Sequence, residues 1–323
     1  MSSEFDAAVN LLASGNSFLI AGHVNPDGDT LGCMCAMGLA LRKIGKFATL
    51  VCADPVPQVY RFIPAADTIL REIPEKPFNT AIIVDCDGLD RTGPLAERIR
   101  TFERFLEIDH HQGKGSGFGV KLIDPSAAAA GELVFELLKR ARIEMDAQIA
   151  ECLLTAVVTD TGSFKFANVT PNTLRIASEL VSAGASPVTI TRNVYESRTF
   201  AGTRLLGLML SALTTVDGGR IVYSSITRDM LAETGASDDD TEGFVNYIRS
   251  VRGAVVGVLF RESEDGASVR ASLRAGNGID VSQVARKFGG GGHKAAAGCT
   301  IEKPLAEAIQ LVLNVIKELG QEE

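Results

Sequence analysis

Residues 18–29 read FLIAGHVNPDGD and combine an apolar run, a turn and the start of a helix. The apolar run 18–21 is typical of a buried strand, and Asn-Pro-Asp-Gly has the composition of a turn. The segment that follows, 29–44, carries apolar side chains at helical spacing. A strand that leads through a loop into a helix is the repeating unit of sheets with parallel strands. This stretch therefore predicts an α/β fold.

The same alternation of strand and helix patterns continues to about residue 186. Strands are predicted at 18–21, 48–52, 80–85 and 105–109, and helices at 29–44, 128–142, 147–160 and 172–183. We therefore expect a parallel sheet with helices on both faces. Asp27, Asp85 and Asp109 lie at or just beyond the carboxyl ends of predicted strands, which is where open α/β sheets place their ligands.

A second, smaller domain is predicted after this sheet, since 323 residues favour two domains. The turn at Asp217, Gly218 and Gly219 leads into a predicted strand at 221–226. More strands are predicted at 254–260 and 268–275, with helices at 241–251 and 305–319. The expected arrangement is a catalytic domain over 1–186, a helical linker over 187–213 and a substrate-binding α/β domain over 214–323, with the active-site cleft between them.

The composition is that of a folded globular protein. Hydrophobic residues make up 46% and charged residues 22%, which excludes disorder and fibrous repeats. No run approaches the roughly 18 consecutive apolar residues of a membrane span. The opening MSSEFDAAVN has no basic segment leading into an apolar one. We therefore expect a cytoplasmic location and no membrane partner.

The net charge argues against binding of long duplex nucleic acid, and the cysteine spacing argues against a zinc knuckle or a disulfide framework. The formal net charge is −8, whereas a protein that follows a long duplex needs a broad excess of Lys and Arg. Long duplex nucleic acid is therefore not expected, and any phosphate site must be local. The six cysteines form no CxxC pair and no framework spacing, so neither a zinc knuckle nor disulfides are predicted.

Only four histidines occur, and each falls in a segment that resembles a site. The first segment, HVNPDGD, offers His23, Asp27 and Asp29 as ligands of a divalent cation, because one imidazole with two carboxylates suits such ions. The alternative is a simple turn in which Asp29 or Thr30 caps the next helix.

Three further segments supply acids or histidines. Asp85 ends an apolar strand in the segment VDCD. Asp109 precedes His110 and His111 in EIDHH. Asp160 ends a helical run in VVTDTG. Two adjacent histidines are hard to explain by packing and favour a metal or catalytic role. The alternatives are a solvated carboxylate for Asp85, an exposed position for one histidine, and a helix cap for Asp160.

Together these segments contain the ligands of a two-metal site: four carboxylates and two imidazoles. Four carboxylates within about 4 to 6 Å of one another repel strongly, whereas two divalent cations balance their charge. Asp85 would bridge both ions. A water shared by two cations becomes hydroxide near neutral pH and can attack phosphorus in line.

The segment FGGGGHKAAAG, residues 288–298, predicts a phosphate site. The glycines leave backbone amides open to an anion, and two cationic side chains follow at once. Upstream, Arg270 and Arg274 alternate with apolar residues and so face one side of a predicted strand. A flexible linker and two solvated arginines are the alternatives. The predicted phosphate-binding residues are Arg270, Arg274, Gly290, Gly291, Gly292, His293 and Lys294.

HVNPDGD, VDCD, DHH and TDTG occur in the order of the four motifs of the DHH phosphoesterases, which this chain resembles. GGGGHKAAAG is similar to the signature of their associated C-terminal domain. The two-domain layout resembles the nanoRNase/pAp-phosphatase branch, whose members trim very short RNAs and dephosphorylate pAp. Short RNA oligonucleotides or nucleotide bisphosphates are thus the implied substrates, and a homodimer is one implied assembly.

The resemblance also implies two cations, usually Mn²⁺, with Mg²⁺ and Co²⁺ as alternatives. One cation would be held by His23, Asp27 and Asp85. The other would be held by Asp29, Asp85, His110 and Asp160.

Roles for four further residues are implied by the same resemblance. Asp109 would support the centre from behind, and His111 would contact the scissile phosphate or assist the leaving oxygen. Arg274 and His293 would hold a phosphate from the second domain. Two other functions stay open: the same site acting on cyclic dinucleotides or polyphosphate, and a metal-stabilised nucleotide-binding module without turnover.

Overall fold

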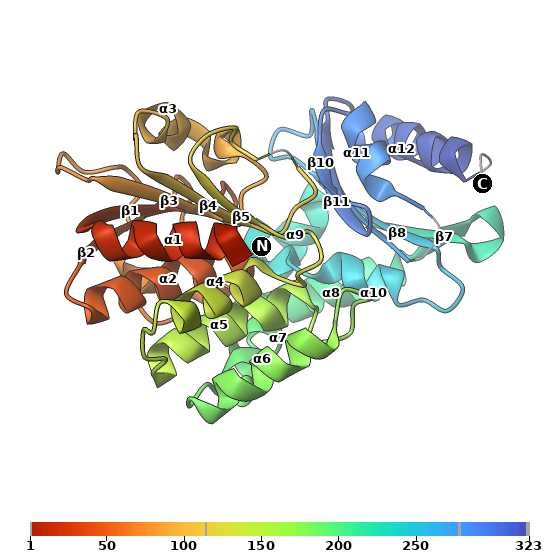
Figure 1. Cartoon of the computed structure of the whole chain (residues 1–323). Helices are drawn as coiled ribbons and strands as arrows, with labels where there is room; N and C mark the ends of the chain where they lie inside the picture. Colours follow the sequence, from red (N-terminus) through yellow and green to blue (C-terminus); the bar gives the residue numbers. More distant parts are fainter. Residues whose placement is uncertain (1, 114, 277–278, 321–323) are drawn as a thin grey trace. The chain divides into compact units, whose positions relative to one another are not determined.

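The computed structural model describes residues 2–113, 115–276 and 279–320 (Figure 1). The chain forms two compact units, which divide between Ser197 and Arg198. The segment predicted as a linker, 187–213, contains α7 (Pro187–Tyr195) in the first unit and α8 (Phe200–Ser211) in the second. Across the described residues, no helix combines the length and apolar character needed to cross a membrane.

A five-stranded parallel sheet organises the first unit and confirms the predicted α/β class. Its strands lie in the order β2-β1-β3-β4-β5. Every residue of β3 and β4 is buried, as expected for central parallel strands. The sequence did not predict β5, a short edge strand that includes Lys121. The bounds are β1 Ser17–Ala21, β2 Phe47–Val51, β3 Thr80–Val84, β4 Phe105–Asp109 and β5 Val120–Ile123.

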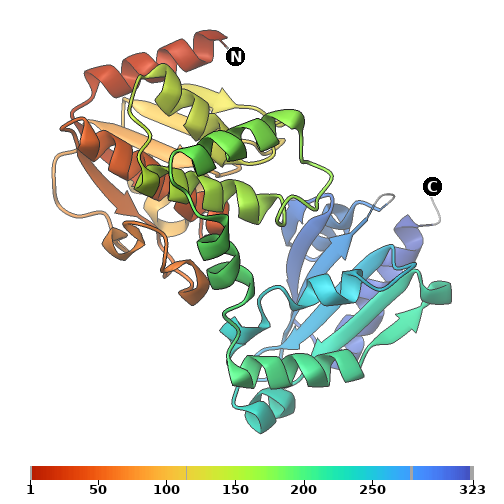
Figure 2. The ribbon, with the colours of Figure 1, turned by 90° about the horizontal axis from the view of Figure 1, so that it is seen from below.

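Helices cover both faces of this sheet unequally. One face packs on a large apolar cluster that contains side chains of α1, α2, α4, α5 and α6, and the other packs on a smaller cluster around α3 (Figure 2). Alternate strand residues supply the two clusters, for example Phe18 and Leu19. The bounds are α1 Ser2–Ser14, α2 Gly28–Lys43, α3 Ala96–Ile99, α4 Ala130–Arg140, α5 Ala147–Asp160 and α6 Pro171–Ser182.

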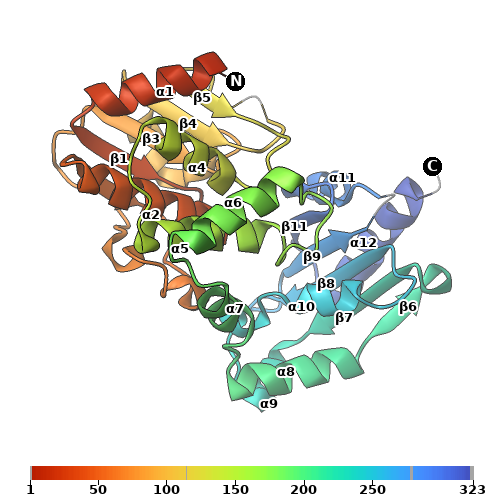
Figure 3. The same ribbon diagram turned by 60° about the horizontal axis from the view of Figure 1, so that its bottom comes forward.

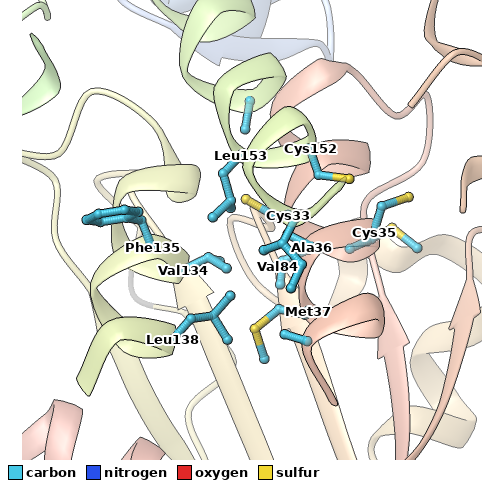
Figure 4. Close-up of a cluster of buried hydrophobic side chains, with 14 of the residues drawn as sticks. Cys33, Cys35, Ala36, Met37, Val84, Val134, Phe135, Leu138, Cys152 and Leu153 are labelled. Carbon is cyan, nitrogen blue, oxygen red and sulfur yellow. The ribbon is translucent and has the colours of Figure 1, made fainter. Parts of the chain in front are cut away.

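Cysteines contribute to the larger cluster as small apolar side chains (Figure 4). Cys33 and Cys35 of α2 lie near Cys152 of α5, with Val84 of β3 beneath them. All six cysteines of the chain are buried and unpaired, as the absence of a disulfide pattern predicted.

Glycines allow α2 and α5 to pack in close contact. A Cβ at Gly32 would lie 2.4 Å from the Cys152 carbonyl oxygen, and one at Gly28 would lie 2.5 Å from the Thr159 side chain. Gly28 thus faces the end of α5 while Gly32 faces its middle, so the two helices run antiparallel. As a result, the start of α2 lies beside the end of α5, where Asp160 is the last residue.

We expect Gly32→Ala to destabilise the first unit by about 1–3 kcal/mol, because the added methyl group meets backbone atoms that cannot move away. The matched control is Gly207→Ala in α8, where an added Cβ meets nothing within 4 Å. There alanine should be neutral or stabilising by up to about 1 kcal/mol. Urea unfolding of both variants measures the difference. Equal stability of Gly32→Ala and wild type would show that the helices can move apart.

The second unit is built on a six-stranded mixed sheet in the order β10-β11-β9-β8-β7-β6. Only β7 and β8 pair in parallel among its described strands. The predicted turn at 217–219 joins β6 to β7. The bounds are β6 Thr214–Val216, β7 Ile221–Ile226, β8 Val256–Glu262, β9 Val269–Ala275, β10 Gly291–His293 and β11 Ala296–Ile301.

Two groups of helices cover this sheet (Figure 3). Side chains of α11 and α12 pack on one apolar cluster, and those of α8, α9 and α10 pack on another. Since the strand residues of the two clusters alternate, the clusters lie on opposite faces. The remaining bounds are α9 Arg228–Thr234, α10 Phe244–Arg249, α11 Val281–Lys287 and α12 Leu305–Leu319.

Candidate metal centre

The strand order places the candidate ligands at one point of the first sheet. The chain passes from β1 to β2 on one side and from β3 to β4 on the other, so the order reverses between β1 and β3. Ligand sites of open α/β sheets lie at the carboxyl ends of the strands at such a reversal. His23 follows β1, Asp85 follows β3, and His110 follows β4.

Asp27 is the N-cap of α2, so the alternative in which Asp29 or Thr30 caps this helix is wrong. Its Oδ1 accepts hydrogen bonds from the amides of Asp29 at 3.0 Å and Thr30 at 3.1 Å. The helix therefore begins one residue earlier than predicted, at Gly28. The other oxygen, Oδ2, lies 4.0 Å from His23 Nε2. Asp27 can thus cap the helix and face a cation at the same time.

Asp29 is buried and connects α2 to the start of α4. Its carboxylate accepts hydrogen bonds from the amides of Ala130 at 2.7 Å and Gly131 at 2.9 Å. The N-cap residue of α4, Ala129, has no side chain that could do this. The negative charge of Asp29 is therefore stabilised by the positive end of the α4 dipole. Cys33 Sγ donates a third, longer hydrogen bond of 3.3 Å.

Asp85 lies at the centre of the site. Its side chain is buried, and its backbone has φ +55, a left-handed conformation in which Asp is tolerated better than most residues. Thr30 Oγ1 donates a hydrogen bond of 2.7 Å to Oδ2. Oδ1 is buried and has no hydrogen-bond partner among the described residues.

His23 and His110 are oriented in the same way. His23 Nδ1 lies 2.7 Å from the Val24 carbonyl oxygen, and His110 Nδ1 lies 3.3 Å from that of Ala127. A carbonyl can only accept, so it holds the proton on Nδ1 and leaves Nε2 as the ligand atom, as in protein metal sites. In both rings Nε2 faces carboxylates. His23 Nε2 is 3.6 Å from Asp85 Oδ2, and His110 Nε2 is 3.5 Å from Asp85 Oδ1.

Asp109 shapes the turn that carries both histidines of the DHH sequence. Its Oδ1 accepts from the His110 amide at 2.8 Å and lies 2.7 Å from His111 Nδ1. The carboxylate therefore fixes the orientation of the His111 ring. His111 Nδ1 also lies 3.7 Å from Asp85 Oδ1.

The ligand atoms converge in three overlapping groups, each with its atoms within 4.8 Å of one another. These groups are His23–Asp27–Asp85, Asp29–His110–Asp160 and Asp85–His110–His111. The third group was not expected, but the Nδ1 of His111 in it is already bonded to Asp109. The first contains the three residues of one predicted ligand set. The second contains three of the four residues of the other set, and the fourth, Asp85, lies 3.5 Å from His110 Nε2.

This donor set fits divalent cations. Carboxylate oxygens with imidazole Nε2 atoms are the ligands that Mn²⁺ and similar ions prefer. A buried carboxylate oxygen without a hydrogen bond is costly unless a cation compensates it, and Asp85 Oδ1 is such an atom. Asp85 is also too deeply buried for the alternative of a solvated carboxylate.

The acids and imidazoles shift one another's pKa values strongly. Burial and the charge of Asp85 raise the pKa of Asp29, and burial and the charge of Asp29 raise that of Asp160 well above its usual value. Burial alone would raise the pKa of Asp85, but the nearby imidazole rings of His110 and His23 outweigh it and hold that pKa well below normal.

The pKa values of His23 and His110 are raised as well. Burial alone would lower their pKa values, but the neighbouring carboxylates outweigh it and raise the pKa of His23 to about 9 and of His110 to about 11. Without cations both rings therefore carry a second proton, on Nε2, and a positive charge at neutral pH. Imidazole binds a cation only in its neutral form, so binding must displace these protons.

We therefore expect the apparent affinity for Mn²⁺ to rise with pH through the neutral range, about tenfold per pH unit for each proton displaced. Calorimetric titration in two buffers with different ionisation enthalpies measures the proton release directly. Asp90→Asn is the control, because Asp90 lies in the loop after β3 but is exposed and pairs with Arg100. Binding heats that do not depend on the buffer would contradict these protonation states.

The predicted arginines of the second unit line a cavity of about 320 Å³ within that unit. Arg270 and Arg274 alternate on β9, and Ser272 lies between them. Arg261 of β8 also lines the cavity and lies directly opposite Arg270 in the sheet. Burial lowers the pKa values of Arg261 and Arg274. The sequence did not identify Arg261 as a candidate. Its position directly after the predicted strand 254–260 was a signal that could have found it.

The glycine tract pairs in the sheet, so the alternative of a flexible linker is wrong. Gly291 and Gly292 belong to β10, which pairs antiparallel with β11, and both line the cavity. A Cβ at Gly290 would lie 2.2 Å from the Gly298 carbonyl oxygen, so the close approach of the two backbones requires glycine there. Lys294 is exposed, and the side chain of His293 lies outside the described part of the structure.

Comparison with known proteins gives two family matches. The model described as "DHH family, N-terminal domain" matches residues 17–157, and the model described as "DHHA1 domain" matches residues 218–322. Together they include every candidate residue of both units except Asp160.

Relatives and a solved structure match nearly the whole chain. A protein of Thermus thermophilus named bifunctional oligoribonuclease and PAP phosphatase NrnA is 36% identical over 93% of this chain and 89% of its own length. A Bacillus subtilis protein of the same name is 25% identical over 88% and 90%. The crystal structure of an exopolyphosphatase-related protein from Bacteroides fragilis has a TM-score of 0.93 at 24% identity, with 99% and 97% of the two chains covered, and shows the same fold.

Proposed function

The chain belongs to the DHH family of phosphoesterases, and we propose that it hydrolyses short oligoribonucleotides to mononucleotides and also removes a phosphate from pAp. That it is a hydrolase of phosphoric esters follows from the family and its NrnA relatives. The observation that carries the finer proposal is the position of Asp85. Its two oxygens face two different groups of ligand atoms, and one oxygen has no hydrogen-bond partner among the described residues.

Two divalent cations, in our proposal Mn²⁺, occupy these two groups. His23, Asp27 and Asp85 hold one ion, and Asp29, Asp85, His110 and Asp160 hold the other. When bound, such a pair of cations lowers the pKa of a water molecule and stabilises the charge that develops on the phosphate oxygens.

The chain's own residues orient the reacting groups. Asp109 keeps the proton of His111 on Nδ1, at 2.7 Å, and thereby holds the ring still. His111 Nε2 is then the ring atom that contacts the scissile phosphate or assists the leaving oxygen. Thr30 restrains Asp85 through its hydrogen bond to Oδ2, at 2.7 Å, so the shared carboxylate keeps one orientation.

The second unit supplies the phosphate contacts. Arg270 and Arg274, with the backbone of Gly291 and Gly292, line one cavity, and Arg261 extends the same positive surface. Guanidinium groups bind phosphate oxygens through paired hydrogen bonds. In this proposal His293, Lys294 and Gly290 complete the site.

Short substrates fit the charge of the protein. The net charge of −8 would repel a long polyanion, whereas a dinucleotide presents few phosphates. The cations and the local arginines are sufficient for such a substrate.

We expect Asp85→Asn to lose more than about a hundredfold in kcat/KM on the RNA dinucleotide pApA and on pAp, because both cations share this ligand. The assay follows release of AMP with Mn²⁺, and the melting temperature of the metal-free variant checks its fold. Asp90→Asn, whose exposed side chain touches neither group of ligand atoms, should keep wild-type rates.

Two outcomes would contradict the proposal. A wild-type protein that releases no mononucleotide from pApA and no phosphate from pAp does not have the proposed substrates. Unchanged turnover in Asp85→Asn would exclude a shared carboxylate. Polyphosphate and a cyclic dinucleotide, assayed in parallel, test the other uses of the same site.

A further inference from the structure

The turn after Asp160 has a backbone that side chains rarely adopt. Gly162, Ser163 and Phe164 have φ values of +55, +61 and +61, three left-handed residues in a row. The buried Thr161 holds this turn in place. Its carbonyl oxygen accepts from the amides of Lys165 at 3.0 Å and Phe166 at 3.1 Å, and its hydroxyl accepts from the Phe164 amide at 3.1 Å. Conformations of this kind persist where the surrounding structure fixes them, often at functional sites.

The turn places two phenylalanines in different surroundings. Phe164 packs against the main apolar cluster of the first unit. Phe166 belongs to none of the apolar clusters of the described residues and is 48% exposed. Core packing therefore explains Phe164 but leaves Phe166 without a role.

Gly162 fixes the ring of Phe166 from one side. A Cβ at Gly162 would lie 2.4 Å from Cζ and 2.6 and 2.7 Å from the two Cε atoms of that ring. These nearly equal distances place the position over the ring face and not beyond its edge. The ring thus lies flat on Gly162, and about half of its residue surface faces outward. Among the described residues, no other ring or cation is stacked on it.

The turn over which this ring lies directly follows a candidate ligand of the metal centre, Asp160. Gly162 is two residues beyond Asp160, which limits the separation of their Cα atoms to about 7 Å. Asn168 closes the loop by donating to the Asp160 carbonyl oxygen at 3.2 Å. The cation of the neighbouring Lys165 lies over the Tyr195 ring, 5.9 Å from its centre, and so leaves the Phe166 ring uncovered.

We propose that Phe166 is a stacking platform for a nucleobase of the substrate whose phosphate lies at the metal centre. Every nucleobase presents a flat π surface, and a ring held in one orientation binds it without reading its sequence. Such a platform makes the enzyme prefer nucleotides over phosphate esters that lack a base. The inference rests on the proposed function for its substrate, but the binding of a nucleotide can be tested without turnover.

The test compares AMP with ribose 5-phosphate, which has the same phosphate and sugar but no base. Wild-type protein loaded with Mg²⁺ is titrated with each compound in a calorimeter. We expect AMP to bind about tenfold to a hundredfold more tightly, the effect of one stacked base. Phe166→Leu keeps an apolar side chain over Gly162 and should lose this preference, whereas Phe166→Tyr should retain it.

The matched control is Phe47→Leu. Phe47 is 78% exposed and begins β2, at the end of the sheet opposite to the metal centre, so its loss should not change AMP binding. In steady-state assays with pApA, Phe166→Leu should raise KM by the same tenfold to hundredfold and leave kcat within about threefold.

Equal affinity of the wild type for AMP and ribose 5-phosphate would overturn the platform, and so would a preference for AMP that survives in Phe166→Leu. Loss of the preference in Phe166→Leu, in a protein whose wild type cleaves neither pApA nor pAp, would support the platform and reject the proposed function. A general folding defect would instead lower the melting temperature and weaken both compounds equally.

Discussion

The mutual repulsion of four carboxylates gathered at one edge of a sheet is the constraint on which this structure depends. The protein reduces it with backbone dipoles, because the amide groups that open α4 bind Asp29 and those that open α2 bind Asp27. These contacts leave one oxygen of Asp85 without a hydrogen-bond partner among the described residues. The cluster is therefore built to be completed by cations.

The packing of α2 against α5 brings two of these carboxylates, Asp29 and Asp160, together. Asp29 lies at the first turn of one helix and Asp160 at the last residue of the other, more than a hundred residues later in the chain. They share one group of ligand atoms because the helices run antiparallel at a distance that only glycine at position 32 allows. The strand order then brings Asp85 and His110 to the same point.

Each candidate ligand carries its own local signal in the sequence, and the structure brings these side chains together at one point. His23, Asp85 and His110 each follow a predicted apolar strand. Their positions after the strands place them at the carboxyl edge of the sheet. What the sequence could not predict depends on distant contacts: the binding of Asp29 by the start of α4, and the edge strand β5, whose pattern is polar at Lys121. The alternative cap at Asp29 or Thr30 is wrong because Asp27 is an equally good N-cap residue, and the sequence alone does not show at which residue the helix begins.

The proposed phosphate site contains few positive side chains, which favours a substrate with few phosphates. Each phosphate bound by Lys or Arg contributes about one unit to the dependence of log affinity on log salt. Only three arginines line the cavity described in the second unit, and Arg261 is already bonded to Thr241. Apart from the proposed cations, these arginines can contact only a few phosphates. A long strand gains nothing from its further phosphates, whereas a base stacked on an aromatic ring adds affinity that salt does not screen. In the proposed function, a preference for short nucleotides would follow from weak charge attraction combined with a contact to the base.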